Sequence, residues 1–174
     1  GEWLQSLPYV KSDKIGVEGF SFGGTMTALL VMRASDKFHF GIAGGGVYDW
    51  ALYDSHYTER YMDTPANNPG GYEVSKVLNY VKGYPADYAA RRSFAAAQDD
   101  KGAAQDAVML KLTHGTGDDN VHHQNTLLLV DALHKEGKKF DFMIYPDGMH
   151  GYYSYQGSHF LLANRDFWLK YLLD

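Results

Sequence analysis

The chain contains no cysteine, which excludes disulfide bonds and zinc–thiolate sites. Basic residues are also few, because 16 Lys and Arg stand against 21 Asp and Glu, and no basic stripe is visible. We therefore expect no nucleic-acid partner. No run approaches the ~18 apolar residues that a membrane span needs, so we expect no membrane segment in this chain. The lack of cysteine does not decide the compartment, because many secreted bacterial proteins also lack it.

The beginning of the chain has no Met, no basic stretch and no apolar signal segment. The opening residues, Gly1-Glu2-Trp3-Leu4-Gln5, look like the middle of a helix. We therefore expect the 174 residues to begin inside a longer protein. They are enough for one domain, and an apolar fraction of 45% is ordinary for a globular protein.

The periodicity of apolar residues predicts alternating strands and helices, which is typical of an α/β domain with a mostly parallel sheet. Strands are predicted at residues 15–19, 38–47, 108–113 and 140–145. Helices are predicted at 1–11 (ending near Pro8), 24–33, 49–62, 121–136 and 159–173, and residues 86–106 are interpreted as a helix plus an exposed connection. Residues 63–72 and 146–158 are predicted as loops, and Met26, Leu29, Leu30 and Met32 as the buried side of helix 24–33. Four strands of this kind form half of a larger sheet.

The first chemical motif is Gly19-Phe20-Ser21-Phe22-Gly23, which matches G-x-S-x-G, and Gly24 extends it. This motif places a nucleophilic serine on a sharp turn from strand to helix, where the N–H of the next residue faces the developing oxyanion. A β-branched strand precedes Ser21 and a helical run follows it, as the motif requires. The alternative is a Gly-rich turn with a capping serine, which this context makes less favourable.

A second motif runs from His114 to Val121 and follows the third predicted strand. An acid in this loop could accept the N–H of a histidine and stabilise the imidazolium that forms during attack. The alternative is that Asp118, Asp119 or Asn120 caps the helix at 121–136.

A third motif, Asp147-Gly148-Met149-His150-Gly151, follows the fourth predicted strand. A histidine flanked by glycine in a loop can face a neighbouring site, and neutral imidazole is a competent general base near pH 7. Taken alone, the motif would favour the interpretation of His150 as a surface histidine in a loop.

The order of the three residues decides between these alternatives. Ser21, then Asp118, then His150 is the order of the triad in α/β-hydrolases, and each follows a separate predicted strand. A competing interpretation is a metal site built from His114, Asp118, Asp119, His122 and His123. Two adjacent helical histidines point about 100° apart and rarely bind one ion, so we expect no metal and no cofactor.

These motifs resemble the prolyl oligopeptidase family, and within it the dipeptidyl peptidase IV type. The resemblance covers nearly the whole chain and includes Trp50 to Met62, a stretch that belongs to the dipeptidyl peptidase branch. It implies an α/β-hydrolase fold with the C-terminal half of a mostly parallel sheet and helices on both faces. Residues 1–174 would be one catalytic-domain portion that lacks its first strands and an upstream β-propeller.

The resemblance also implies residue roles. Asp118, not Asp119, would be the triad acid, and the Phe22 N–H would be one oxyanion donor. Asn120 would contact the backbone carbonyl of the substrate. The pocket before the scissile bond would be lined, together with Phe22, by Val47, Trp50, Tyr53, Tyr57 and Val121. An aromatic, uncharged pocket of this kind suits proline or alanine.

The expected function is a serine peptidase that cuts after proline or alanine and releases N-terminal dipeptides through an acyl-enzyme on Ser21. One alternative is an acylaminoacyl-peptidase or esterase with the same triad, and another is a non-catalytic interaction domain or an inactive fragment. The partner would be a peptide substrate. The family often dimerises through this domain, so a homodimer is possible, and the resemblance favours a secreted or periplasmic location. We expect weak or no activity from the isolated chain, because it would expose a strand edge and would lack the second oxyanion donor, which lies upstream in the family.

Overall fold

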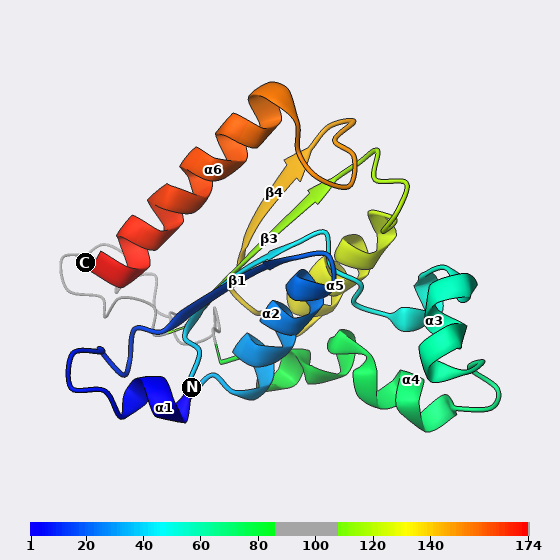
Figure 1. Ribbon diagram of the computed structural model, residues 1–174, viewed down its shortest axis with the longest axis horizontal. Coiled ribbons are helices and arrows are strands. Elements are labelled where there is room, and N and C mark those ends of the chain that lie inside the picture. The colour runs from blue at the N-terminus through cyan, green and yellow to red at the C-terminus, as the bar shows by residue number, and fades with distance from the viewer. Residues whose placement is uncertain (86–107, 174) are drawn as a thin grey trace.

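The computed structural model describes residues 1–85 and 108–173. Its centre is a four-stranded parallel sheet with the strand order β1-β2-β3-β4. The strands are β1 (Gly16–Phe20), β2 (Phe40–Gly44), β3 (Met109–Gly115) and β4 (Asp141–Tyr145). The predicted α/β arrangement is confirmed, with helices on both faces of the sheet (Figure 1). The helix and connection predicted at 86–106 lie outside the described residues.

The two faces of the sheet carry different helices. On one face pack α2 (Phe22–Arg33), the 3₁₀-helix η2 (Val77–Gly83) and α5 (Gln124–Lys135). On the other face lies α6 (Ser154–Trp168), which continues into the π-helical segment η4 (Leu169–Leu173) (Figure 1). Sequential parallel strands joined by right-handed crossovers place α2 and α5 on the same face. All four strands therefore end at one edge, where the loops meet.

Each face has its own apolar core. Between the sheet and the α2–α5 side lie the buried residues Ala28, Val31, Met32, Val81, Leu110, Leu112, Leu129 and Leu133. Under α6 lie Phe40, Ile42, Met109, Phe167 and Tyr171. Residues two apart on one strand, such as Leu110 and Leu112, share a face, as the alternation of a strand requires.

The remaining helices are short. They are α1 (Glu2–Gln5), the 3₁₀-helix η1 (Trp50–Leu52), α3 (Ser55–Met62) and α4 (Pro69–Ser75). The single helix predicted at 49–62 is therefore divided into η1 and α3. Each piece has its own aspartate cap: the Asp49 carboxylate accepts from the Ala51 N–H at 3.1 Å, and the Asp54 carboxylate accepts from the Tyr57 N–H at 2.8 Å. Two caps so close together begin two helices.

Two predicted loops are wrong in part. Residues 63–72 were expected to be a loop, but α4 begins at Pro69, capped by the Asn68 side chain, which accepts from the Gly71 N–H at 3.1 Å. Asn followed by Pro is an N-cap and first-turn signature, which composition alone obscured. The loop 146–158 is also shorter than predicted, because α6 begins at Ser154. Within α6, a Cβ on Gly157 would lie 2.6 Å from the Tyr152 carbonyl oxygen, so the helix needs glycine at this position.

The buried side of α2 also differs from the prediction. Met26 is exposed, and the fully buried positions include the small residues Thr25, Thr27 and Ala28. The reason is the close approach of α2 to the sheet, since a Cβ on Gly41 of β2 would lie 2.6 Å from Val31 Cγ2. A helix this close to a strand needs small side chains at the contact.

Thr25 ties α2 to the chain just after β2. Its hydroxyl donates to the Val47 carbonyl at 2.8 Å and accepts from the Val47 N–H at 3.0 Å. Thr27, on the same helix, is equally buried at 1% exposure, but its hydroxyl has no hydrogen-bond partner among the described residues. The two threonines therefore differ in bonding and not in burial.

We predict that Thr25→Val lowers the free energy of unfolding by about 1–3 kcal/mol, because the Val47 N–H and C=O lose their buried partner. Thr27→Val serves as the matched control and should be neutral or slightly stabilising, because it removes only an unpaired hydroxyl. Urea titration of both variants measures the difference. Equal effects at the two positions would contradict the role of Thr25.

Candidate active site

Ser21 occupies the sharp turn between β1 and α2. Its backbone has φ 59° and ψ −124°, a conformation that non-glycine residues rarely adopt. The Ser21 N–H donates to the Gly44 carbonyl at 2.8 Å, and its own carbonyl accepts from the Gly24 N–H at 2.9 Å. The strained turn is therefore held from both sides, as expected for a nucleophile raised above the sheet edge.

Asp118 lies in the turn after β3, and its side chain is only 1% exposed. Its Oδ1 accepts from the backbone N–H groups of Asn120 at 3.0 Å and Val121 at 2.9 Å. Its Oδ2 lies 2.8 Å from His150 Nδ1. Both carboxylate oxygens are thus bonded, which a buried carboxylate requires.

His150 lies in the loop after β4, and this loop is bonded to the Asp118 loop. The Gly117 N–H donates to the Gly148 carbonyl at 3.0 Å, and the Asp147 N–H donates to the Thr116 hydroxyl at 2.8 Å. A Cβ on Gly115 would overlap the Gly148 carbonyl, so glycine at the end of β3 allows the two loops to touch. The contact between the loops fixes the distance between acid and histidine.

The structure brings Ser21, Asp118 and His150 together. His150 Nε2 lies 2.9 Å from Ser21 Oγ, while His150 Nδ1 lies 2.8 Å from Asp118 Oδ2. An ionised carboxylate only accepts hydrogen bonds, so the proton is on Nδ1 and Nε2 is free to accept from the serine hydroxyl. This arrangement can take a proton from Ser21 and can stabilise the imidazolium that results. His150 is 18% exposed, so a substrate can approach it.

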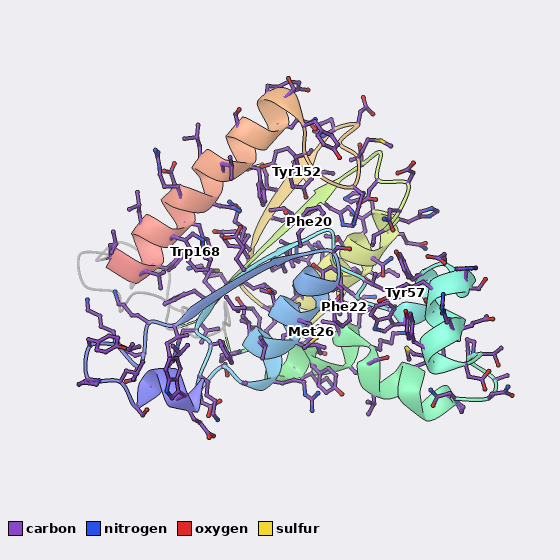
Figure 2. The ribbon with its side chains drawn as sticks, in the orientation of Figure 1. Phe20, Phe22, Met26, Tyr57, Tyr152 and Trp168 are labelled. Carbon is purple, nitrogen blue, oxygen red and sulfur yellow. The ribbon has the colours of Figure 1, made fainter. Side chains whose placement is uncertain are left out.

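Tyr152 anchors the histidine loop, a role that the sequence did not reveal. Its ring packs against Phe20 at 5.5 Å and Tyr145 at 4.2 Å, and its hydroxyl donates to Thr113 Oγ1 at 3.0 Å. Burial raises the pKa of the Tyr152 hydroxyl, which keeps it protonated as a donor. Phe20 also packs on the His150 ring at 5.2 Å. Figure 2 shows Phe20 and Tyr152 near each other by the sheet. In the sequence, the only hint of this role was the position of an aromatic residue, Tyr152, two residues after His150.

Phe22 begins α2, so its backbone N–H has no partner within the helix. The N-terminal end of a helix carries a partial positive charge and attracts developing negative charge. The N–H of this residue lies directly after Ser21 in the chain. The geometry therefore supplies a donor of the type that holds an oxyanion.

The side chain of Phe22, the residue after Ser21, lines an aromatic hollow with a volume of about 310 Å³. It is lined by Phe22, Trp50, Tyr57, Thr58, Tyr61 and Met62. The Trp50 ring stacks on Tyr57 at 6.2 Å and meets Phe22 at 5.8 Å. Figure 2 shows Phe22 and Tyr57 on neighbouring elements, α2 and α3. The hollow has no charged side chain in its wall, which suits an apolar group.

The other predicted pocket residues lie around this hollow. Val47 and Val121 are buried and pack with Trp50 and Tyr72 in one cluster. They therefore support Trp50 from the protein interior and do not line the hollow itself. Tyr53 packs against this cluster, and its hydroxyl donates to Asn120 Oδ1 at 2.7 Å. Because that bond occupies its oxygen, the exposed Asn120 amide has its N–H₂ available as a donor.

Two alternative roles were considered for the segment around Asp118, namely capping of the following helix and metal binding. The N-cap of α5 is His123, and no side chain caps this helix, so Asp118, Asp119 and Asn120 do not act as its caps. Among residues 1–85 and 108–173, no group of three or more His, Asp or Glu is arranged to hold a metal ion.

In the same part of the chain, no helix has the length and apolar character to cross a bilayer.

Comparison with known proteins places the chain in context. The model of the prolyl oligopeptidase family matches residues 1–174. The "Probable dipeptidyl-aminopeptidase B" of Uncinocarpus reesii is 39% identical over 164 residues, which cover 93% of this chain and 16% of that protein. The corresponding Neurospora crassa protein is 36% identical over 169 residues, covering 96% of this chain and 16% of the relative. The chain thus spans about one sixth of the length of these relatives.

Solved structures give the same result for the fold. The dipeptidyl peptidase 4 of Porphyromonas gingivalis superposes with a TM-score of 0.80 and 34% identity, covering 96% of this chain and 21% of that one. The predicted α/β-hydrolase fold is confirmed by this similarity.

Gly23 and Gly24 form a matched pair for testing the turn. A Cβ on Gly24 would lie 2.5 Å from the Gly44 carbonyl oxygen, whereas a Cβ on Gly23 would meet nothing within 4 Å. We predict that Gly24→Ala destabilises the protein by roughly 1–3 kcal/mol, because α2 must move away from β2. Gly23→Ala should be neutral or stabilising by about 0.5–1 kcal/mol, the usual gain in a helix. Urea titration compares the two, and a more harmful Gly23→Ala would contradict this packing.

Proposed function

This chain belongs to the prolyl oligopeptidase family, and from that membership we propose that it is the catalytic part of a serine peptidase. In this proposal the enzyme cleaves after proline or alanine and releases dipeptides from the N-terminus of a peptide. The observation that carries it is the pair of hydrogen bonds that links Ser21, His150 and Asp118 at 2.9 and 2.8 Å. The names of the relatives support dipeptide release.

In the first step, Ser21 Oγ attacks the carbonyl carbon of the scissile bond while its proton moves to His150 Nε2. The Asp118 carboxylate stabilises the charged imidazole. The oxyanion accepts a hydrogen bond from the Phe22 N–H and from a second donor outside these residues. The tetrahedral intermediate then collapses: the carbon–nitrogen bond breaks, His150 gives its proton to the leaving amine, and an ester forms on Ser21.

In the second step, water attacks the ester carbonyl. His150 takes a proton from this water, and the resulting tetrahedral intermediate releases Ser21 Oγ, which recovers a proton from His150. The products are the dipeptide acid and the free serine. The enzyme returns to its starting state without any external reactant other than water.

The aromatic hollow sets the preference for the residue before the scissile bond. A proline ring or an alanine methyl group fits against Phe22, Trp50 and Tyr57, and nothing in this wall would pair with a charge. Tyr53 and Asn120 stand at its side, where the amide of Asn120 can donate to a substrate backbone carbonyl.

The 174 residues are proposed to be one portion of an α/β-hydrolase domain, completed by further strands and an upstream β-propeller. The short coverage of the relatives supports this arrangement. A peptide is the proposed substrate. Homodimer formation, which the resemblance implies, stays a prediction that the mass of the intact protein in solution would decide.

An acylaminoacyl-peptidase or esterase would use the same triad, so substrate choice distinguishes it from the proposed enzyme. We predict that the intact protein hydrolyses a Gly-Pro anilide with a free amine, and that N-acetylation of this substrate reduces kcat/KM by at least about tenfold. The measurement is the release of the anilide chromophore from both substrates. Preference for the acetylated form would favour the alternative enzyme instead.

We predict that Ser21→Ala abolishes labelling by a fluorophosphonate probe, because no nucleophile is left.

Asp118→Asn should lower kcat by roughly 10⁴-fold, because an amide does not hold His150 in the required tautomer. The neighbouring, exposed Asp119 gives the matched control, since Asp119→Asn should leave kcat within about twofold. Labelling at another serine, or equal losses for the two Asp variants, would reject the triad. No labelling of the unmodified protein would indicate a non-catalytic domain.

A further inference from the structure

His114, on β3, is a completely buried histidine directly beside the candidate triad. Its side chain has 0% exposure. Nε2 lies 2.8 Å from the Val121 carbonyl oxygen, and Nδ1 lies 2.6 Å from Thr126 Oγ1 on α5. Because a carbonyl oxygen only accepts, Nε2 carries the proton, and Nδ1 accepts from the Thr126 hydroxyl. The bonds thus select one neutral tautomer, and burial lowers the pKa of His114, which favours the neutral form.

The proton on Nε2 faces the turn that carries the acid. Nε2 is 3.2 Å from Asp118 Oδ2, the same oxygen that His150 binds at 2.8 Å. Val121, whose carbonyl accepts from His114, donates its own N–H to Asp118 Oδ1 at 2.9 Å. His114, Val121 and Asp118 therefore form a closed set of contacts that touches both oxygens of the carboxylate.

We propose that His114 is a positioning residue: its Nε2–H holds the Asp118–Val121 turn so that Asp118 Oδ2 faces His150. The same turn carries Asn120 and Val121, so His114 also sets one side of the substrate site. This inference rests on the proposed function, because it concerns the orientation of the proposed catalytic acid.

A role in packing alone does not account for these contacts. A buried polar ring costs free energy unless each nitrogen is bonded, and an apolar side chain of similar size would fill the space without that cost. What histidine adds is one N–H aimed at the Val121 carbonyl and the Asp118 carboxylate. The test therefore needs two comparisons. One compares side chains of similar volume with and without this donor, and the other compares variants that lose similar stability but differ in whether the donor remains.

The test uses His114→Gln, His114→Leu and Thr126→Val in the intact protein. Glutamine can place an amide N–H near the position of Nε2, and leucine cannot. Thr126→Val leaves His114 Nδ1 without its donor, which lowers stability, but it keeps the Nε2–H bond to Val121. We measure kcat and KM on a Gly-Pro anilide, the rate of fluorophosphonate labelling of Ser21, and the urea midpoint.

His114→Leu should lower kcat and the labelling rate by roughly 10- to 100-fold, because a small shift of the acid misaligns His150. His114→Gln should keep most of the activity, and Thr126→Val should keep kcat within about twofold despite a lower urea midpoint. In proton NMR, the downfield signal of the His150–Asp118 hydrogen bond should persist in the Gln and Val variants and weaken in the Leu variant.

Two results would overturn the proposal. One is full activity of a folded His114→Leu variant, and the other is a loss in His114→Gln or Thr126→Val that equals the loss in His114→Leu. Should the Leu variant not fold, His114→Asn replaces it, because the asparagine amide oxygen can accept from Thr126 near the position of Nδ1 while no donor is left near Nε2, and its kcat should fall likewise. If the unmodified protein is neither labelled nor active, the proposed function fails, and this is decided before any variant is compared.

Discussion

The hydrogen bond between His150 and Asp118 is the interaction on which the rest of the site depends. It joins the loops after β3 and β4, and it leaves Nε2 of the same ring facing Ser21 after β1. Since β1 and β4 are the outer strands of the described sheet, the bond between His150 and Ser21 connects the loops that follow the first and the last strand. A sheet of parallel strands makes this possible, because all of its strands end at one edge.

The elements that build the core also build the site. The first turn of α2 supplies Ser21 and the Phe22 N–H, and Thr25 one turn later holds Val47 under the aromatic wall. On α5, the Asn125 side-chain oxygen accepts from the N–H groups of Tyr48 and Asp49 at 3.1 and 3.2 Å. Two helices packed on one face of the sheet therefore fix the segment that leads into Trp50. The pocket wall consists of short helices and turns, and the hydrogen bonds from Thr25 and Asn125 hold the segment beneath it.

Three buried polar side chains near the triad hold backbone groups. Thr25, Asn125 and His114 each bind main-chain atoms of a segment that has no regular ladder of its own. A loop at the edge of a sheet leaves its N–H and C=O groups without strand partners, and burial makes each unpaired group costly. These three residues, on α2, β3 and α5, meet this need, which explains why polar side chains are buried at these positions.

The residues that the structure brings together in the candidate site were indicated by motifs in the sequence. The G-x-S-x-G motif after a β-branched run indicated the serine turn, and the order Ser21, Asp118, His150 indicated a triad at the ends of three strands. The strands were located to within a few residues, except that β2 is shorter than the predicted 38–47. Two helix starts were missed. Residues 63–72 were predicted as a loop from their Pro, Gly and Asn content, although α4 begins at Pro69, and the start of α6 at Ser154 lies within the predicted loop 146–158.

The sequence by itself determined the nucleophile turn, the parallel α/β arrangement and the identity of the candidate triad, because each depends on neighbours in the chain or on a repeating pattern. Only the tertiary structure decided the distances of 2.9 and 2.8 Å, the anchoring of the histidine loop by Tyr152 and the bonds of His114. These depend on contacts between β3, α5 and the loop after β4, and no spacing within one segment encodes which side chain another segment will meet.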